Sequence, residues 1–256
     1  TRGVTVSATE PTTLAIVHLD SNGERSFSFY RNHTADVELT INELPMEMLE
    51  SCRTLCFGSV ALTTPPLRDT VLAAIEHAKA AGALLVYDPN YRPLLWPDTE
   101  TAVHWMRKGL EKADILKASD DEALLLTGAD SPLKALEALV STGIPLVCIT
   151  MGSKGAMTGY DGKTDIHPAI PPEKVVDTTG AGDTFLGTLV SELIRTGIVE
   201  PDKNRDSEMF HLASGRHCDL AACVRTANAA ASLCISGGGA IPAMPDMETV
   251  RRLAGQ

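Results

Sequence analysis

The residues best suited to chemistry lie together in one short stretch, from Val176 to Gly187. Gly180 and Gly182 flank Ala181 there, Asp183 follows directly, and the apolar residues beyond it repeat with the period of a helix. Small residues before a helix let backbone N–H groups approach an anion, and the helix adds about half a positive charge at that end. The pattern therefore predicts a phosphate site in which the Asp183 carboxylate can accept a proton from a nearby hydroxyl.

The same stretch also has a purely structural interpretation. In it, Asp183 caps the helix and the two glycines only make a tight turn. Two other phosphate motifs are excluded, because the chain has no P-loop ending in Gly-Lys-Ser or Gly-Lys-Thr and because Phe185 stands where a dinucleotide fingerprint has its third glycine. This stretch alone does not distinguish a phosphate site from a helix cap, so the rest of the sequence is needed to choose between them.

Strand and helix signals alternate along most of the chain, which predicts βαβ units on a parallel sheet with helices on both faces. Strands are expected at 14–19, 25–30, 54–58, 83–87, 114–117 and 146–150, and helices at 66–81, 99–112, from 119, at 131–143 and at 221–235. An Asn-Gly turn at 21–23 is expected to join the first two strands, and a second hairpin is expected at 155–167. From Gly180 onward the chain is expected to be almost entirely helical.

Composition excludes several classes of protein. Of 256 residues, 44% are hydrophobic and 21% are charged, which is typical of a globular domain and not of a disordered or fibrous chain. With 22 basic and 33 acidic side chains the net charge is −11, which argues against binding to nucleic acid or to an anionic membrane. No apolar run reaches the ~20 residues that a membrane span needs, and no secretory signal opens the sequence. We expect a cytoplasmic protein.

The six cysteines form no CxxC pair, and Cys52 and Cys56, four residues apart, have no second pair to complete a zinc site. Most of the six lie in apolar segments. Buried, reduced thiols are the expectation.

Five segments, in order, carry motifs that resemble those of the ribokinase-like (PfkB) sugar kinases. The motifs are FxFYR…AD, which is similar to fructokinases in particular, then DPNxR…W, KxSxxE…G, TxGxxG and DTTGAGD. They lie at Phe27–Asp36, Asp88–Trp96, Lys117–Gly128, Thr150–Gly155 and Asp177–Asp183. The resemblance covers nearly the whole chain and implies a three-layer α/β fold with a mainly parallel sheet and a small β lid, residues 1–40 being the lid remnant and 41–256 the kinase domain.

The resemblance also implies a role for each motif. Asp183 would be the base, and the amides of Gly180, Ala181 and Gly182 would stabilise the phosphoryl group in transfer. The residues implied for ATP are Lys117, Ser119, Thr150, Gly152, Gly155 and Asn228. Those implied for the sugar or its phosphate are Tyr30, Arg31 and Arg92, with Asp183. Glu122 would hold water on Mg²⁺, and Asp177 and Thr179, with the backbone of 237–239, would hold a monovalent cation such as K⁺.

Several of these residues have simpler explanations. Ser119 and Glu122 also read as a helix capping box, and both roles can hold together. Asn228 could be a solvent-facing helix residue, and Arg31 and Arg92 could be ordinary surface arginines, although a guanidinium suits phosphate recognition. Tyr30 could simply pack within the lid.

Two departures from the family pattern bear on these expectations. Ser119 stands where many members have Asn, but fructokinase-like members often have Ser there, so this departure supports the fructokinase resemblance. The family's first segment, with a sugar-contacting Asp and a Gly-Gly motif, has no counterpart in these residues, so for this stretch alone we expect a compromised fold and weak or no sugar phosphorylation.

The sequence as a whole predicts an ATP-dependent sugar kinase, with ATP, Mg²⁺ and K⁺ as cofactors, a small sugar as substrate and a possible homodimer formed through the lid. Fructokinase, which converts D-fructose to fructose 6-phosphate, is the first expectation. The alternatives are a 2-keto-3-deoxygluconate kinase and a catalytically silent regulator that binds nucleotide or sugar.

Overall fold

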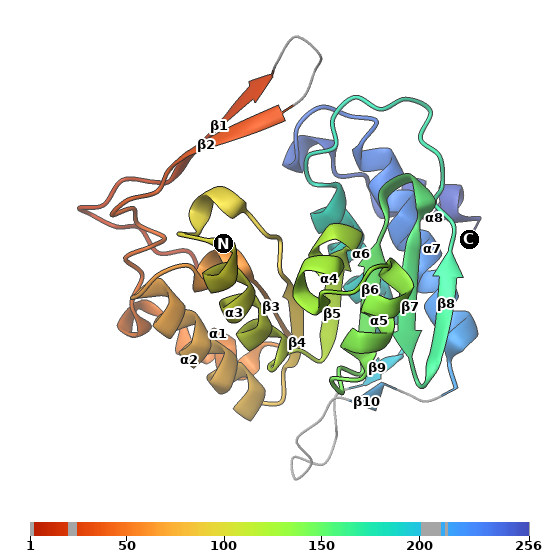
Figure 1. Ribbon diagram of the computed structural model, residues 1–256, viewed down its shortest axis with the longest axis horizontal. Helices are drawn as coiled ribbons and strands as arrows, with labels where there is room; N and C mark the ends of the chain where they lie inside the picture. The colour runs from red at the N-terminus through yellow and green to blue at the C-terminus, as the bar shows by residue number, and fades with distance from the viewer. Residues whose placement is uncertain (1–2, 20–24, 201–210, 213–214, 256) are drawn as a thin grey trace. The chain divides into compact units, whose positions relative to one another are not determined.

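The computed structural model describes residues 3–19, 25–200, 211–212 and 215–255 (Figure 1). Contacts between residues divide the chain into two compact units, Thr1–Asp114 and Ile115–Gln256. Within the described residues, no helix is long and apolar enough to cross a membrane.

The first unit opens with an antiparallel pair of strands, β1 (Leu14–Leu19) and β2 (Arg25–Tyr30). Their register places Leu14 opposite Tyr30, and both of these side chains are exposed. Both strands match the sequence prediction, whereas the predicted turn at 21–23 falls outside the described residues.

A parallel βαβ unit follows in the same part of the chain. β3 (Thr54–Gly58) pairs with β4 (Leu84–Asp88), and α2 (Leu67–Ala80) connects them. All five residues of β4 are buried, and the first four, Leu84–Tyr87, form the apolar run that predicts a strand covered on both faces. α3 (Thr99–Leu110) comes next, and the Asp98 carboxylate accepts a hydrogen bond from the Thr101 amide to cap it.

Four short elements of this unit were not predicted. They are η1 (Ile41–Glu43), α1 (Met46–Ser51), η2 (Ser59–Leu62) and η3 (Pro93–Leu95). α1 buries only Leu49, so its sequence shows no repeating apolar face by which a helix could be recognised.

The sheet of the second unit begins with two parallel strands, β5 (Ile115–Ser119) and β6 (Leu146–Thr150). β7 (Ala156–Tyr160) and β8 (Lys163–His167) extend it as the predicted antiparallel hairpin. The turn at Asp161 and Gly162 has φ of 51° and 71°, the left-handed geometry that matches the twist of a two-residue hairpin.

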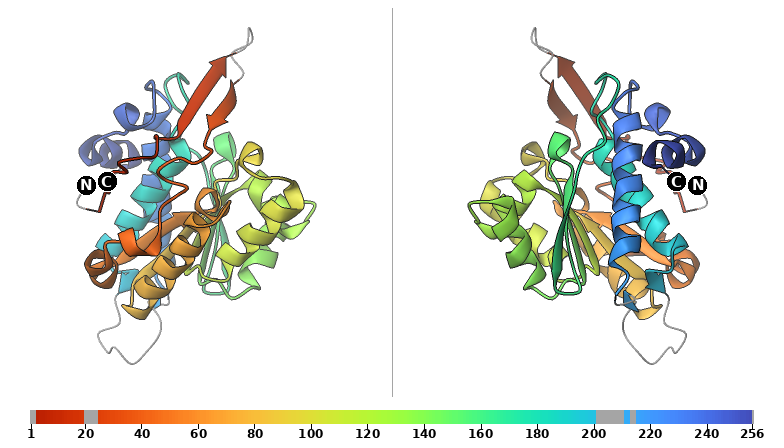
Figure 2. Two further views of the ribbon diagram at one scale, coloured as in Figure 1. Left: turned by 90° about the vertical axis from the view of Figure 1, so that its left-hand side faces the viewer. Right: turned by 90° about the vertical axis from the view of Figure 1, so that its right-hand side faces the viewer.

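Helices cover both faces of this sheet. In Figure 2, α4 (Asp120–Thr127) and α5 (Pro132–Val140) lie on one side of strands β5 to β8, and α6 (Ala181–Arg195) and α7 (His217–Cys234) lie on the other. α8 (Met247–Ala254) and η5 (Ile241–Ala243) complete the unit, and α8 packs on α7 through an apolar cluster that includes Ala229, Ala230 and Val250. The three-layer α/β arrangement that the sequence predicts is confirmed.

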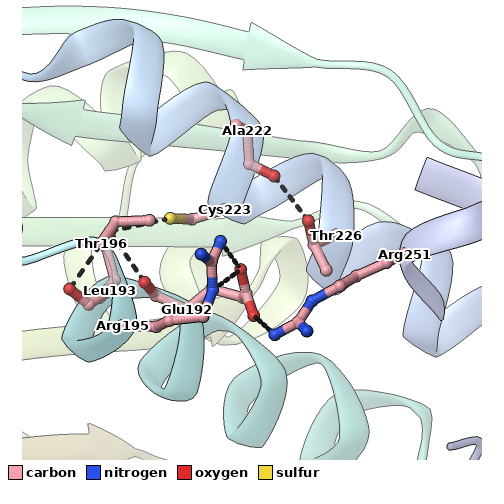
Figure 3. Close-up of polar contacts among 8 residues, drawn as sticks. All are labelled: Glu192, Leu193, Arg195, Thr196, Ala222, Cys223, Thr226 and Arg251. Atoms are coloured by element: carbon pink, nitrogen blue, oxygen red, sulfur yellow. Dashed lines mark hydrogen bonds and ion pairs between the residues drawn. The ribbon is translucent and has the colours of Figure 1, made fainter. Parts of the chain in front are cut away.

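A buried carboxylate ties α6 to α8. Glu192, 1% exposed, accepts hydrogen bonds from Arg195 on its own helix (2.6 and 2.9 Å) and from Arg251 on α8 (3.1 Å; Figure 3). Both arginines are about half exposed, so their guanidinium groups keep contact with water while they neutralise the buried charge. This arrangement holds the helix that begins at the Gly-Ala-Gly-Asp motif.

The expectation that the chain is almost entirely helical after Gly180 is wrong. α6 ends at Arg195, and the short strands β9 (Val199–Glu200) and β10 (His211–Leu212) pair before α7 begins. Two-residue strands are too short to show an alternating pattern. α7 also starts at His217, earlier than the sequence suggests.

The expectation of buried thiols holds for Cys148, Cys223 and Cys234, all of which are free. It is wrong for Cys56, which is exposed, and Cys52 is only half-buried. Successive side chains of a strand point to opposite faces, so Cys56 is exposed beside the buried Phe57 although the β3 sequence is apolar.

Candidate active site

The Asp183 carboxylate stands exposed in the first turn of α6. Gly180 is the N-cap, with φ of 81°, and provides no side chain to cap the helix, while the Thr184 amide already bonds to the Gly180 carbonyl (2.8 Å). Within the described part of the chain, the Asp183 carboxylate forms no hydrogen bond or ion pair. Asp183 is thus not the cap. The Ala181 amide donates to the Thr178 carbonyl (3.3 Å), and the N-cap residue makes no side-chain hydrogen bond to the helix start, so its partial positive charge can act on a ligand.

Lys117 places a positive charge at the same helix end. Its side chain, on β5, is buried (6% exposed), and its Nζ lies 3.0 Å from the point where a Cβ of residue 182 would be. Gly182 therefore allows the ammonium group to approach the first turn of α6. The structure brings together Lys117, Gly182 and Asp183, which the sequence assigned to two separate motifs.

The capping box at α4 is confirmed. The Ser119 hydroxyl accepts from the Glu122 amide (3.2 Å), and Glu122 Oε2 accepts from the Ser119 amide (2.8 Å). A carboxylate oxygen can accept more than one hydrogen bond, so the cap does not by itself prevent Glu122 from also contacting the water of a metal ion. The structural and the functional interpretation of this pair are compatible.

Asp177 links the loop before α6 to the glycine-rich loop after α7. Its two carboxylate oxygens accept hydrogen bonds from the amides of Thr179 (2.7 Å) and Gly239 (3.0 Å). Gly180 packs against the same loop, since a Cβ added to Gly180 would lie only 3.1 Å from the Cβ of Ala240. The residues that the sequence grouped as a cation site are therefore neighbours in space.

The predicted ATP residues at the edge of the sheet lie on β6 and the turn after it. The Thr150 hydroxyl donates to the Ala118 carbonyl (3.3 Å), and Gly152, with φ of 55°, opens the turn η4 (Gly152–Lys154) with open space on its Cβ side. Gly155 is required for packing, because a Cβ there would clash with the His167 carbonyl oxygen.

Asn228 is buried, so the suggestion that it faces solvent is wrong. Its side-chain amide donates to the Pro168 carbonyl (3.0 Å). This hydrogen bond joins the segment after β8 to α7. If Asn228 contacts a nucleotide, it does so with a side chain that the Pro168 carbonyl holds in place.

Of the predicted sugar residues, Asp183 belongs to the second unit, and Tyr30, Arg31 and Arg92 belong to the first. Tyr30 is exposed at the end of β2, and Arg92 is half-buried with its Nη1 donating to the Tyr91 carbonyl (3.0 Å). Arg31 is neither free nor on the surface. It donates to Asp36 (2.8 Å), to the Thr63 hydroxyl (2.8 Å) and to the Val60 carbonyl (3.2 Å).

The network around Arg31 was missed in the sequence, although the motif FxFYR…AD contains both of its charged members. Burial acts to raise the pKa of the Asp36 carboxyl, but hydrogen bonds from Thr13, Thr34 and Arg31, with the charge of Arg31, hold that pKa below its usual value. The Arg and the Asp of the motif are thus partners, and their main structural effect is to fix the base of the hairpin to η2.

We expect Arg31→Met and Asp36→Asn to destabilise this unit by similar amounts, about 1–2 kcal/mol each, because each breaks the same charge-assisted bond. The double variant should cost little more than either single one, as measured by urea unfolding. Lys134→Met, which removes an exposed ion pair with Asp130, serves as the control and should cost less than about 0.5 kcal/mol. Fully additive losses at Arg31 and Asp36 would contradict the pairing.

The oxygen ligands among the predicted site residues fit the ions that the sequence implies. Carboxylate and carbonyl oxygens of the kind found at Asp177, Glu122 and Asp183 are the ligands that Mg²⁺ and K⁺ prefer, and Mg²⁺ usually keeps several waters and binds phosphate oxygens as well. Within the described residues, no three His, Cys, Asp or Glu side chains converge on a metal position.

The fold and the open, positively charged start of α6 beside an exposed carboxylate define an α/β phosphotransferase of small molecules. The model of the pfkB family of carbohydrate kinases matches residues 1–247. This chain belongs to that family.

Relatives and solved structures agree with this assignment. A probable fructokinase-4 of Arabidopsis thaliana is 37% identical over 254 residues, which cover 98% of this chain and 73% of that protein. A fructokinase of Vibrio cholerae O395, solved with fructose, ADP and calcium, has a TM-score of 0.79 at 29% identity and covers 97% of this chain and 75% of its own. A fructokinase of Xylella fastidiosa with bound ATP has a TM-score of 0.82 at 26% identity, with coverage of 97% and 75%.

Proposed function

We propose that this chain belongs to an ATP-dependent fructokinase, which transfers the γ-phosphoryl group of ATP to the 6-hydroxyl of D-fructose and yields fructose 6-phosphate and ADP. The observation that carries the proposal is the exposed Asp183 carboxylate at the uncapped, positive start of α6, next to the buried ammonium of Lys117. The match to the pfkB family of carbohydrate kinases and the similarity to a probable fructokinase also support the proposal.

The reaction assigns a distinct task to each group around α6. The oxygen of the 6-hydroxyl forms a bond to the γ-phosphorus, its proton passes to Asp183, and the bond from the phosphorus to the bridging oxygen breaks, so that ADP leaves. The amides of Gly180, Ala181 and Gly182 would stabilise the charge of the transferring group, although the Ala181 amide also donates to the Thr178 carbonyl (3.3 Å). Mg²⁺, bound through water on Glu122, would neutralise charge on the phosphate oxygens.

The other assignments follow the same proposal. ATP is held by Lys117, Ser119, Thr150, Gly152, Gly155 and Asn228, while Tyr30, Arg31 and Arg92 serve the sugar. Arg31 acts mainly by fixing the hairpin, since its guanidinium is occupied by Asp36, Thr63 and Val60. A dimer formed through β1 and β2 is part of the proposal, because exposed apolar residues such as Leu14, Ile16 and Val17 follow one another on an open two-stranded sheet.

The test is ADP release from ATP in the presence of Mg²⁺ and K⁺, with protein made from the complete reading frame that contains this chain. Fructose, 2-keto-3-deoxygluconate, ribose and adenosine are compared as acceptors. Release stimulated chiefly by fructose is the expected result. Stimulation by another acceptor would keep the mechanism and overturn the sugar assignment, and ATP binding without release would favour a silent regulator.

We expect K⁺ to stabilise the protein through Asp177. A ligand that binds only the folded state raises its stability in proportion to RT ln(1 + concentration/Kd). The thermal midpoint should therefore rise more in KCl than in tetramethylammonium chloride of equal strength. Asp177→Asn should lose this difference, because the amide keeps a single acceptor oxygen for two backbone donors and a cation. A K⁺-specific rise that survives in Asp177→Asn would place the cation elsewhere.

A further inference from the structure

The turn η2 contacts two segments of the first unit that carry predicted sugar residues. At its end, the Thr63 hydroxyl and the Val60 carbonyl accept hydrogen bonds from Arg31, at the base of the β1–β2 hairpin (2.8 and 3.2 Å). At its start, the Ser59 amide donates to the carbonyl of Pro89, in the loop after β4 (3.0 Å). We call Ser59, Val60 and Thr63 the η2 bracket. The bracket joins the hairpin to the loop by bonds that lie within one unit.

Thr63 holds the Arg31 side of the bracket. It is buried (8% exposed), and its hydroxyl donates to the Val60 carbonyl (3.0 Å) while it accepts from Nη1 of Arg31. Nη2 of Arg31 donates to the same Val60 carbonyl. A hydroxyl has one proton, so once that proton is on Val60 only the lone pairs of the oxygen remain for the guanidinium. Thr63 thus fixes both acceptors that the two Nη atoms of Arg31 meet.

The Pro89 side of the bracket depends on a close approach of two backbones. A Cβ added to Gly58, the residue before the bracket, would lie 2.9 Å from the Asp88 carbonyl oxygen, which cannot swing away as the end of a side chain could. Asp88 Oδ1 accepts from the Asn90 amide (3.2 Å), and Asn90 has φ of 46°, a left-handed conformation that Asn tolerates better than most residues. The loop that leads to Arg92 is therefore held by η2 at one residue and by Asp88 at the next.

We propose that the η2 bracket keeps the hairpin base and the loop after β4 in one arrangement, which makes Thr63 a positioning residue for the sugar. Tyr30 directly precedes Arg31, and Arg92 closely follows Pro89, so the predicted sugar contacts of both segments depend on the same turn. The inference rests on the proposed kinase function and deepens it. Since the predicted ATP residues all lie in the second unit, a loosened bracket should raise KM for the sugar and leave KM for ATP unchanged.

The kinetic test replaces Thr63 with Val in protein made from the complete reading frame. Valine has a similar volume but no hydroxyl, so the change removes both hydrogen bonds of this side chain. KM for fructose, or for the sugar that the acceptor comparison selects, should rise about three- to tenfold, which one typical hydrogen bond would account for. Both kcat and KM for ATP should stay within about twofold. Thr63→Ser keeps the hydroxyl and should restore KM for the sugar.

Thr70→Val is the matched control. Thr70 is also buried in the first unit, and its hydroxyl donates to the Leu39 carbonyl (2.9 Å), outside the bracket and outside the two segments that it joins. The control should lower the thermal midpoint as Thr63→Val does and leave KM for the sugar unchanged. If Thr63→Val also left that KM unchanged, Thr63 would be a structural residue only and the proposal would be overturned. A rise in KM for ATP as large as the rise for the sugar would overturn it as well.

Hydrogen exchange tests the link without any substrate. Thr63→Val should speed amide exchange in the peptide 88–96, which is distant from position 63 in the sequence, and Thr70→Val should not. Unchanged exchange in this peptide would show that the two ends of the bracket are independent, against the proposal. If the unaltered protein released ADP with no acceptor, the proposed function would fail and the sugar role with it, while the exchange result would still decide whether η2 links the hairpin to the loop.

Discussion

Replacing Asp183 with Asn should lower kcat for sugar phosphorylation by about 10²–10⁴-fold, the range typical of a lost general base, and leave ATP binding nearly unchanged. Asn has the shape of Asp but cannot take the proton of the sugar hydroxyl. Because the Asp183 carboxylate is exposed and makes no hydrogen bond within the described residues, its replacement should not disturb α6. The measurements are ADP release at saturating sugar and calorimetric binding of an ATP analogue.

Glu248→Gln is the matched control for this loss. Glu248 is also an exposed acid in the first turn of a helix, α8, so its replacement changes the charge at a helix start without touching the proposed site. We expect its kcat to stay within about twofold of the unaltered protein. Turnover that survives in Asp183→Asn would show that the base is another group, and a fall in ATP affinity equal to the fall in kcat would make Asp183 a nucleotide ligand instead.

The largest effect on stability is expected at Glu192. Replacing it with Gln should destabilise the second unit by about 2–4 kcal/mol near pH 7, because the buried amide can no longer neutralise Arg195 and Arg251 and must itself be satisfied in place. The urea midpoint measures the loss. Arg251→Met should cost less, since Glu192 keeps Arg195, and it should cost almost nothing more once Glu192 is already Gln.

The effect of Glu192 should depend on pH in a defined direction. Burial acts to raise the pKa of the Glu192 carboxyl, but hydrogen bonds from Arg195 and Arg251, together with their charges, hold that pKa below its usual value. A lowered pKa in the folded state means that the stabilisation is complete above the unfolded value, about 4.3, and is lost as pH falls through the folded value.

The difference in unfolding free energy between the unaltered protein and Glu192→Gln should therefore be constant from about pH 6 to about pH 8 and shrink below about pH 4.5. Glu137→Gln, at an exposed position of α5, should differ by less than about 0.5 kcal/mol at every pH. A difference at Glu192 that persists unchanged to about pH 3 would contradict the ionised, arginine-paired state.

Local signals in the chain were enough for most of the secondary structure. The buried strands β4 and β6 are mostly apolar runs, and the residues that start α4 and α5, Ser119 and Ser131, are recognisable caps, so sequence and structure agree there almost to the residue. β3 was also recognised as a strand, but only Phe57 in it is buried. The elements that were missed, α1 and the pair β9 and β10, are too short to repeat an apolar pattern. Their formation depends on the contacts that they make after the rest of the chain has folded.

The sequence by itself determined the type and order of the residues in five motifs, the helix that must follow Gly180, and the acid in its first turn. Each of these features depends on residues that are only a few positions apart. For such residues, the separation along the chain largely sets the separation in space.

Only the tertiary structure decided which of those residues meet. Asn228 reaches Pro168 across 60 residues, Arg31 reaches Thr63 across 32, and Lys117 lies against the one helical glycine that leaves room for it. Such contacts are set by the packing of strands and helices that are distant in sequence, so no local pattern encodes them. They turn a list of family motifs into a helix start with an exposed carboxylate in its first turn, which is the feature that the experiments above probe.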